Sequence, residues 1–440
     1  MLNFMVKDNR QRLFEMMNRV SGMPLIKEET STPNLPTWAS SSVNDFIPLE
    51  DYEEQVPCST NIQEVERDLN PKSAEVTDPI KWLQDKDAAI AAGKKQDVET
   101  GGRLSPLMIA NARKGDKFNV SSMDAHKLSN TEKEKVKLSP TTKFGKLDYD
   151  LEELKKILNV VPAPDQIIGQ NGKMGKTNFY NITLPAFKGI YCDNKTGKFY
   201  IINVCDKADT CKKVCFAQMG NFVKNDPTVR LNAQKLNYLL NNAETWKNRV
   251  INGIKALYDG VSLVVVRWHD SGDFLSEEYM KLAFEVAAAT EFAEHYAYSK
   301  EVSTAKKLES IRPDNFEFKF SFGGKEDNLI DKSKDAHAVI VPKEVFADLQ
   351  PDEKKIDKKT KREYMGKGWK FSPEAVVELK NRLAEKYGID ANTIKTHEEL
   401  KHIPYNKKNG RVWNVIGAMG DSDIAALRRD VLGIYLLVHK

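Results

Sequence analysis

Residues 261–268, VSLVVVRW, are the feature that most constrains how this chain can fold. An unbroken run rich in β-branched residues is typical of a strand that is buried on both faces of a parallel sheet. Residues 269–274 then read HDSGDF, and residues 276–290 have a serine at the start and acidic residues in the first turn, as a capped helix does. Segments with strand and helix patterns alternate from there onward, which predicts a parallel α/β architecture.

The length and the number of predicted strands favour a (β/α) barrel of the TIM type, complete or incomplete, over an open sheet. We assign this barrel to residues 146–440, with one long helix over residues 228–258. Residues 1–145 are expected to form an N-terminal extension that begins with an amphipathic helix. Within it, residues 27–76 are rich in Ser, Thr, Pro and acidic residues. Such a stretch buries too little apolar surface to offset its chain entropy, so we predict a disordered linker.

The charge balance and the cysteine usage exclude several classes of protein. The 67 basic and 63 acidic residues leave a formal charge of +4, which excludes binding of polyanions by bulk charge. No apolar run approaches the roughly 20 residues that a membrane span needs, and the first residues lack a secretory signal. Five cysteines in 440 residues do not form a disulfide scaffold. We therefore expect a soluble cytoplasmic protein, acting in the host cytoplasm if a phage encodes it.

The HDSGDF motif is the first candidate active site, because active sites of parallel α/β folds lie at the carboxyl ends of strands. Two carboxylates on one tight turn can raise one another's pKa and so divide acid and base roles. The candidate catalytic residues are Asp270, Asp273 and His269. The candidate substrate-binding residues of the same motif are Arg267, Ser271, Gly272 and Phe274. The structural alternative is a turn in which the aspartates only cap backbone groups.

Cys205, Cys211 and Cys215 lie within eleven positions in a chain that holds only two other cysteines. Thiolates at this density suit Zn²⁺ or an iron–sulfur cluster such as [4Fe–4S], and nearby lysines favour the ionised thiol. Their spacing matches neither a zinc ribbon nor the usual C-x-x-C knuckle. Cys192, a histidine or an exchangeable molecule is the candidate for a fourth ligand. The alternative is three buried free cysteines.

Three further segments carry weaker signals. In SFGGKED, the glycines permit close approach to a planar ligand and the next residues offer polar contacts, which makes Gly323, Gly324, Lys325 and Glu326 candidate substrate-binding residues. A plain turn is the alternative there. The basic stretch at residues 354–370 contains aromatic residues and is either a nucleic-acid lid or a solvated loop. Residues 419–423, MGDSD, offer two more carboxylates or a helix cap.

The combination of NFYNITLPA, C-x5-C-x3-C-F-A, RWHDSGDF and YAYSK resembles the phage family named for gene product 88, over about residues 170–325. DSGDF is also similar to the DSGGF turn of tRNA-guanine transglycosylases and of their phage DNA counterparts, which insert 7-deazaguanines. That resemblance implies a barrel, Asp270 as the matching aspartate and GGKE as a base-binding loop. CKKVCFA is similar to the ends of some cysteine loops that hold [4Fe–4S] in radical-SAM enzymes.

The leading hypothesis from these resemblances is a base-exchange transglycosylase, a pentosyltransferase that inserts a modified guanine into nucleic acid. DNA is favoured over tRNA as its macromolecular partner, and a modified purine base is its small-molecule substrate. Exchange of a base passes through an oxocarbenium-like transition state, which strand-end aspartates can serve. The first alternative is a radical-SAM-like iron–sulfur enzyme. The second is a non-catalytic phage binding protein that is stapled by metal.

Overall fold

The structure is a computed structural model that describes part of the chain. It describes residues 67–83, 85, 151–170, 178–213, 215, 217, 226–349, 355–356, 363–364, 371–405, 410–418 and 422–437. The amphipathic helix expected at the N-terminus and most of the extension lie outside the described residues. Of the basic stretch at residues 354–370, only a short antiparallel ladder of β10 (Lys355–Ile356) and β11 (Glu363–Tyr364) is described.

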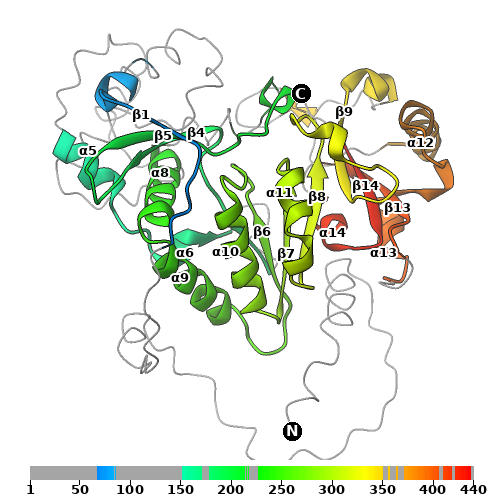
Figure 1. Cartoon of the computed structure of the whole chain (residues 1–440). Coiled ribbons are helices and arrows are strands. Elements are labelled where there is room, and N and C mark those ends of the chain that lie inside the picture. The colour runs from blue at the N-terminus through cyan, green and yellow to red at the C-terminus, as the bar shows by residue number, and fades with distance from the viewer. Residues whose placement is uncertain are drawn as a thin grey trace, which may run out of the picture.

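One large sheet organises the described part of the chain (Figure 1), with its strands in the spatial order β12-β13-β14-β9-β8-β7-β6-β3-β2. Neighbouring strands are parallel except for the antiparallel pair of β2 and β3. The predicted buried strand is β6, and the run of strands and helices that follows it is confirmed. The strands are β2 (Ile168–Gly169), β3 (Phe179–Ile182), β6 (Val264–Trp268), β7 (Ala293–Ser299), β8 (Phe316–Ser321), β9 (His337–Val341), β12 (Ile394–Thr396), β13 (Trp413–Ala418) and β14 (Val431–Leu437).

This sheet is open among the described residues, which corrects the expectation of a TIM-type barrel. Strands β3, β6, β7, β8 and β9 follow one another in space as in the sequence. The chain then crosses to the edge strand β12 and returns through β13 to place β14 beside β9. The last strand of the chain therefore pairs inside the sheet and not with the first, so β2 and β12 remain as separate edges.

Helices cover both faces of the large sheet, whereas a barrel would place them on the outer face alone. On one face lie α9 (Ala243–Ala256), α10 (Glu277–Ala288) and α11 (Val302–Lys307), in front of β6, β7 and β8 in Figure 1. The opposite face packs against α13 (His397–Lys401) and α14 (Ser422–Leu427). The hydroxyl of Ser276 accepts the backbone N–H of Tyr279 at 3.1 Å, which confirms the predicted N-cap of α10.

The long helix expected over residues 228–258 is two helices, α8 (Asp226–Asn241) and α9, which meet at Asn242. Asn242 has φ −143° and ψ 52°, outside the helical region. Helix α8 contributes to two core clusters, and α9 contributes to one of them. Val229 of α8 packs into a cluster with the smaller sheet, whereas Leu236 of α8 and Trp246 of α9 share the cluster under the large sheet. Helix α12 (Pro373–Tyr387) is capped by Ser372 at its start and by Gly388 at its end, as predicted.

A smaller antiparallel sheet holds part of the N-terminal extension against the body. It has the order β1-β5-β4, with β1 (Ser73–Glu75), β5 (Phe199–Asn203) and β4 (Lys188–Cys192). Beside it lies α5 (Leu151–Leu158), whereas α6 (Pro164–Ile167) lies against α9 and the edge strand β2. Leu69 and Leu83 are 2% and 1% exposed and belong to the core. Residues 67–76 were expected to be disordered linker, so this part of the prediction is wrong. Pairing with β5, which is distant in sequence, supplies the burial that the segment lacks by itself.

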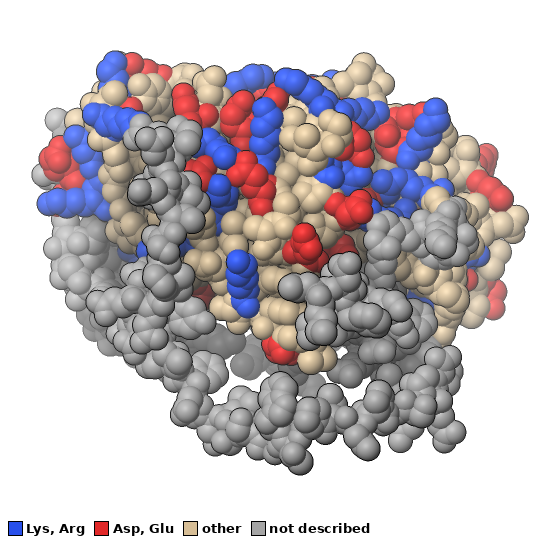
Figure 2. Space-filling view, turned by 60° about the horizontal axis from the view of Figure 1, so that its bottom comes forward, with Lys and Arg blue, Asp and Glu red and all other residues tan. Residues whose placement is uncertain are grey.

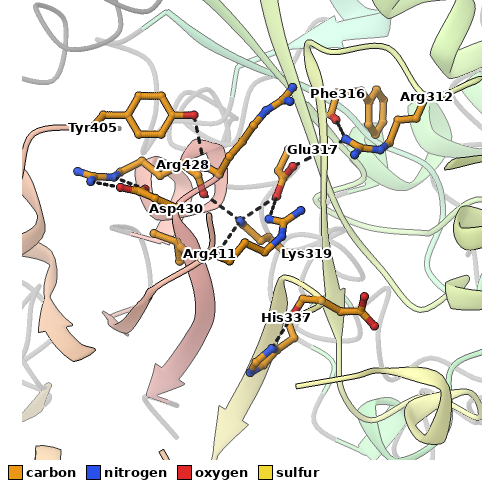
Figure 3. A network of polar contacts seen from close by, with 12 residues as sticks. Arg312, Phe316, Glu317, Lys319, His337, Tyr405, Arg411, Arg428 and Asp430 are labelled. Atoms are coloured by element: carbon orange, nitrogen blue, oxygen red, sulfur yellow. Dashed lines mark hydrogen bonds and ion pairs between the residues drawn. The ribbon is translucent and has the colours of Figure 1, made fainter. Parts of the chain in front are cut away.

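A buried polar network joins β8 to the chain between α14 and β14 (Figure 3). The ammonium of Lys319, fully buried, donates to a carboxylate oxygen of Glu317 at 3.1 Å and to the carbonyls of Arg428 and Val431, each at 3.0 Å. Arg411 also donates to Glu317, at 2.5 Å. Burial by itself would raise the pKa of Glu317, but the charges of Lys319 and Arg411 outweigh it and hold the pKa at about 2.

We expect Lys319→Met to lower the free energy of unfolding by about 3–5 kcal/mol, because it leaves buried acceptors without their donor. The folded-state pKa of Glu317 lies below its ordinary value of 4.5. The stability from Glu317 is therefore present above pH 4.5 and is lost as the pH falls from 4.5 toward 2. Urea denaturation at several pH values checks both effects. The matched control is Lys334→Met, whose side chain is 80% exposed. Equal stability of the two variants would contradict the network's role.

Candidate functional site

The cysteine loop and the glycine-rich loop, which were separate motifs in the sequence, are paired through their backbones. The carbonyl oxygen of Gly323 accepts the N–H groups of Asp209 and Cys211 at 3.0 and 3.1 Å. The N–H of Lys325 donates to the carbonyl of Lys207 at 2.7 Å. The first loop follows β5 and the second follows β8. Both loops therefore meet at the carboxyl edge of the large sheet.

Gly323 is required at this junction. Its φ of +97° is a conformation that residues with a Cβ rarely adopt, and a Cβ there would lie 3.2 Å from both the N and the Cβ of Cys211. The two glycines thus receive the cysteine loop, whereas the sequence suggested a planar ligand. Glu326 forms an ion pair with Lys207 at 2.6 Å, which adds a second link between the loops.

The three clustered cysteines, Cys205, Cys211 and Cys215, are each partly exposed. Cys211 and Cys215 act electrostatically on Cys205, and the charge of Asp273 reaches Cys205 and Cys211. Burial raises the pKa of Cys205 and of Cys211, and the charge of Lys300 opposes this rise at Cys211. No three His, Cys, Asp or Glu side chains of the described residues stand ready to hold a metal ion. Three thiols on one loop are nevertheless a donor set that suits Zn²⁺ or an iron–sulfur cluster.

Cys192 does not join these three. It lies in an apolar cluster, 1% exposed, with residues of α5 and α8. Cys192 pairs with Phe199 at one end of the β4–β5 pair. Phe187 lies at the other end, and its N–H donates to the sulfur of Cys205 at 3.4 Å. Five residues of strand separate the two ends, a distance of about 16 Å. The structure therefore places the candidate fourth ligand away from the cluster.

Asp273 links the HDSGDF turn to the turn that follows β7 by hydrogen bonds. Its carboxylate accepts the hydroxyl of Ser299 at 2.7 Å, the N–H of Lys300 at 2.9 Å and its neighbour Phe274's N–H at 2.8 Å. The side chain is buried, and this burial raises the pKa of Asp273. Three donors occupy the carboxylate, so the capping alternative describes Asp273 better than the catalytic one.

The carboxylate of Asp270 points to different partners. One oxygen accepts the side-chain amide of Asn181 at 2.6 Å, and the other accepts the hydroxyl of Thr183. Both donors come from the end of β3 and the residue after it, next to β6. The two aspartates of the motif therefore diverge and do not form the expected acid–base pair. Asp270 is an oriented, partly exposed carboxylate at the sheet edge.

The rest of the motif supports the turn from within. His269 has φ +60°, and its Nε2 lies 3.0 Å from the hydroxyl of Tyr279. Burial lowers the pKa of His269 to about 3, so its imidazole is neutral and inaccessible. Phe274 is 1% exposed and packs on the ring of Trp268. Gly272, with φ +88°, allows the turn to pass Leu184, which a Cβ would approach to 2.9 Å. These contacts are those of a core and not of a substrate pocket.

Arg267 lies on the face of β6 that packs against α14. Its guanidinium pairs with Asp423 at 3.1 Å and lies over the ring of Tyr298, 5.5 Å from the ring centre. Burial would lower the pKa of Arg267, but the charge of Asp423 outweighs it and raises the pKa. The MGDSD segment thus contributes the partner of Arg267. Within the described residues, Nε of Arg267 and Oγ of Ser271 are buried and have no hydrogen-bond partner.

Lys235 of α8 is a buried lysine that the sequence analysis did not single out. The side chain is buried, and Asp270 supplies the charge that acts on it. Burial lowers the pKa of Lys235 to about 8, and the charge of Asp270 partly offsets this. Nothing in the local pattern of α8 distinguishes this lysine from a surface one. Asn181 and Thr183 were missed for the same reason, since only the pairing of β3 with β6 brings them to Asp270.

The sequence model of the family described as Gene product 88 matches residues 166–396, which is more than half of the 440-residue chain. This chain belongs to the phage Gene product 88 family. The match contains the cysteine loop, the HDSGDF turn, the glycine-rich loop and Lys235. In this chain, the strands β13 and β14 and the helix α14, which carries Asp423, follow the matched region. No curated protein and no solved structure matches the chain.

None of the helices in the described part of the chain is long and apolar enough to cross a membrane.

Proposed function

We propose that this member of the Gene product 88 family is an enzyme whose site lies at the carboxyl edge of the large sheet. Cys205, Cys211 and Cys215 hold a metal centre there, and Asp270 acts on a substrate bound beside it. The observation that supports the proposal is the backbone pairing of the cysteine loop with Gly323, which brings the loop that carries Cys205 and Cys211 to the strand ends. Active sites of parallel α/β sheets are built at this edge.

Three protein ligands leave one position open to substrate or water, as catalytic metal sites require. When bound, Zn²⁺ would supply a Lewis acid and an iron–sulfur cluster would supply electrons. The chain's own residues provide the remaining parts: Asp273 and Gly323 hold the loops together, and Asp270 presents an oriented carboxylate. The radical-SAM-like alternative gains support from this arrangement, because the cysteine loop lies between β3, the first parallel strand, and the helix that follows it.

Base exchange on nucleic acid is the second candidate. The orientation of Asp270 by two uncharged donors favours it, since a carboxylate held in this way can act on an anomeric carbon or a leaving base. A two-aspartate mechanism needs a carboxylate other than Asp273, whose acceptors are occupied. Basic and acidic side chains are interspersed on the face in Figure 2, so we propose that nucleic acid is held by a local site and not by bulk charge.

The metal centre is tested by purification without oxygen, followed by metal analysis and absorbance spectroscopy. We expect about one zinc ion per chain in a colourless protein, or a brown protein with iron and absorbance near ~400 nm. Cys205→Ser, Cys211→Ser and Cys215→Ser should each lose most of the metal. Cys192→Ala is the matched control and should retain it, because this cysteine lies in a separate apolar cluster. Wild-type protein without zinc or iron contradicts the proposal.

The reaction is tested by nucleoside analysis of DNA and tRNA from host cells that express the protein. A modified purine that depends on Asp270 but not on the three cysteines favours base exchange without a metal role. A product that requires both favours the metal-dependent enzyme. Unchanged nucleosides in a metal-loaded, soluble protein would count against nucleic acid as the substrate in both versions.

A further inference from the structure

The described part of the N-terminal extension contacts the cysteine loop through an ion pair. The ammonium of Lys72, which precedes β1, lies 2.5 Å from a carboxylate oxygen of Asp206. Asp206 directly follows Cys205 in the chain, and its other carboxylate oxygen accepts the side-chain amide of Asn203 at 3.1 Å. The side chain of Asp206 is only 16% exposed, so solvent and salt screen this pair less than a fully exposed one.

Backbone hydrogen bonds hold the same segment on β5. The N–H of Asn203 donates to the carbonyl of Lys72 at 3.1 Å, and the N–H of Val76 donates to the carbonyl of Phe199 at 2.9 Å. The side chains of β1 are all exposed, so the ladder with β5 and not side-chain burial fixes this strand. Because β5 leads directly into the cysteine loop, the segment is bound to the strand from which that loop starts.

A second anchor of this segment lies before Lys72 in the chain. The guanidinium of Arg67 pairs with Glu244 of α9 at 2.9 Å and with Glu285 of α10 at 2.7 Å. The side chain of Leu69 is 2% exposed and belongs to the cluster under the large sheet. The backbone is therefore fixed on both sides of Lys72, which lowers the entropy that its side chain loses when it pairs with the cysteine loop.

We propose that residues 67–76 form an N-terminal brace for the cysteine loop, with Lys72 as the positioning residue for Cys205. The proposal rests on the proposed function and assigns control of that site to the N-terminal extension. The match to the Gene product 88 family begins at residue 166, so the brace lies outside the matched region. The sulfur of Cys205 accepts the N–H of Phe187 at 3.4 Å, a contact that a displaced loop would lose. A thiol that is already held in place binds a metal more tightly, because binding then costs less ordering of the loop.

The test compares two ion pairs that join the same two strands. Lys72→Met breaks the pair with Asp206, whereas the matched control Lys198→Met breaks a pair with Glu75, at 3.0 Å, at the end of β5 away from the cysteine loop. The readout is the rate at which Cys205 reacts with iodoacetamide in the full-length protein after chelation of metal, followed by mass spectrometry. We expect Lys72→Met to raise this rate roughly 2- to 5-fold, because a looser loop exposes the sulfur more often. Lys198→Met and the conservative Lys72→Arg should react as the wild type does.

An unchanged rate in Lys72→Met would overturn the brace, and so would an equal rise in Lys198→Met, which would show only a general loosening of the small sheet. Asp206→Asn removes the same pair from its other side. Combined with Lys72→Met it should react no faster than either single variant, since both changes remove one interaction. The alkylation of Cys205 requires no metal. A rise in Lys72→Met in a protein that binds neither zinc nor iron would therefore support the brace and contradict only the proposed metal centre.

Discussion

Asp270→Asn is expected to abolish most of the activity and to leave the melting temperature nearly unchanged. Losing one acid–base contribution lowers a rate by about 10²–10⁴-fold, and losing a nucleophile costs at least as much. The side-chain amide of asparagine has almost the shape of the carboxylate and can still accept one of the two hydrogen bonds from Asn181 and Thr183. Product formation in the nucleoside assay and thermal melts on the same preparations measure the two effects.

The matched control for this variant is Asp259→Asn. Asp259 lies before β6, at the end of that strand opposite to Asp270, and caps the backbone N–H groups of Val261 and Ser262. It should lose a little stability and keep its turnover. A folded Asp270→Asn protein with normal turnover would end the catalytic assignment of Asp270.

Asp273→Ala is expected to destabilise the fold by about 3–5 kcal/mol, which makes it the largest stability effect among the site residues. The change removes the acceptor of the hydroxyl of Ser299 and of the N–H groups of Lys300 and Phe274, all in a buried setting. The turn after β6 and the turn after β7 then lose their link. Because Lys300 also faces Cys211, we expect the metal content to fall together with the stability.

Urea denaturation and metal analysis of Asp273→Ala check this prediction, and Asp273→Asn is the informative second variant. It keeps one acceptor oxygen and should recover part of the lost stability. If Asp273 were catalytic, Asp273→Asn would instead fold as stably as the wild type and have no activity. That result would restore the original two-aspartate interpretation of the motif.

Much of the local structure could be predicted because its causes lie in adjacent residues. The β-branched run at Val264–Trp268 forms a buried strand, and Ser276 caps the next helix, since both depend on neighbours along the chain. The position of HDSGDF and of SFGGKED at strand ends follows from the same patterns. The cysteine spacing also identified a loop that lies at this edge of the sheet.

The predictions that failed involve contacts between distant segments. Whether the sheet closes into a barrel depends on which strands pair. The pairing of β14 with β9 cannot be recognised from the sequence pattern of either strand. The docking of residues 67–76 needs β5, a strand that is distant from them in the sequence. The periodicity of apolar residues predicts which side of a helix or strand is buried. It does not predict which other segment packs against that side.

The candidate site shows the same division. The sequence by itself determined which residue types gather at the carboxyl ends of the strands, because strand, turn and cap chemistry are local. Only the tertiary structure decided that Asp270 and Asp273 diverge, that Cys192 lies apart, and that the charge of Asp270 acts on the buried Lys235. The physical reason is that hydrogen bonds and charges act over a few ångströms in space, and the folded sheet brings together residues that are far apart in the chain.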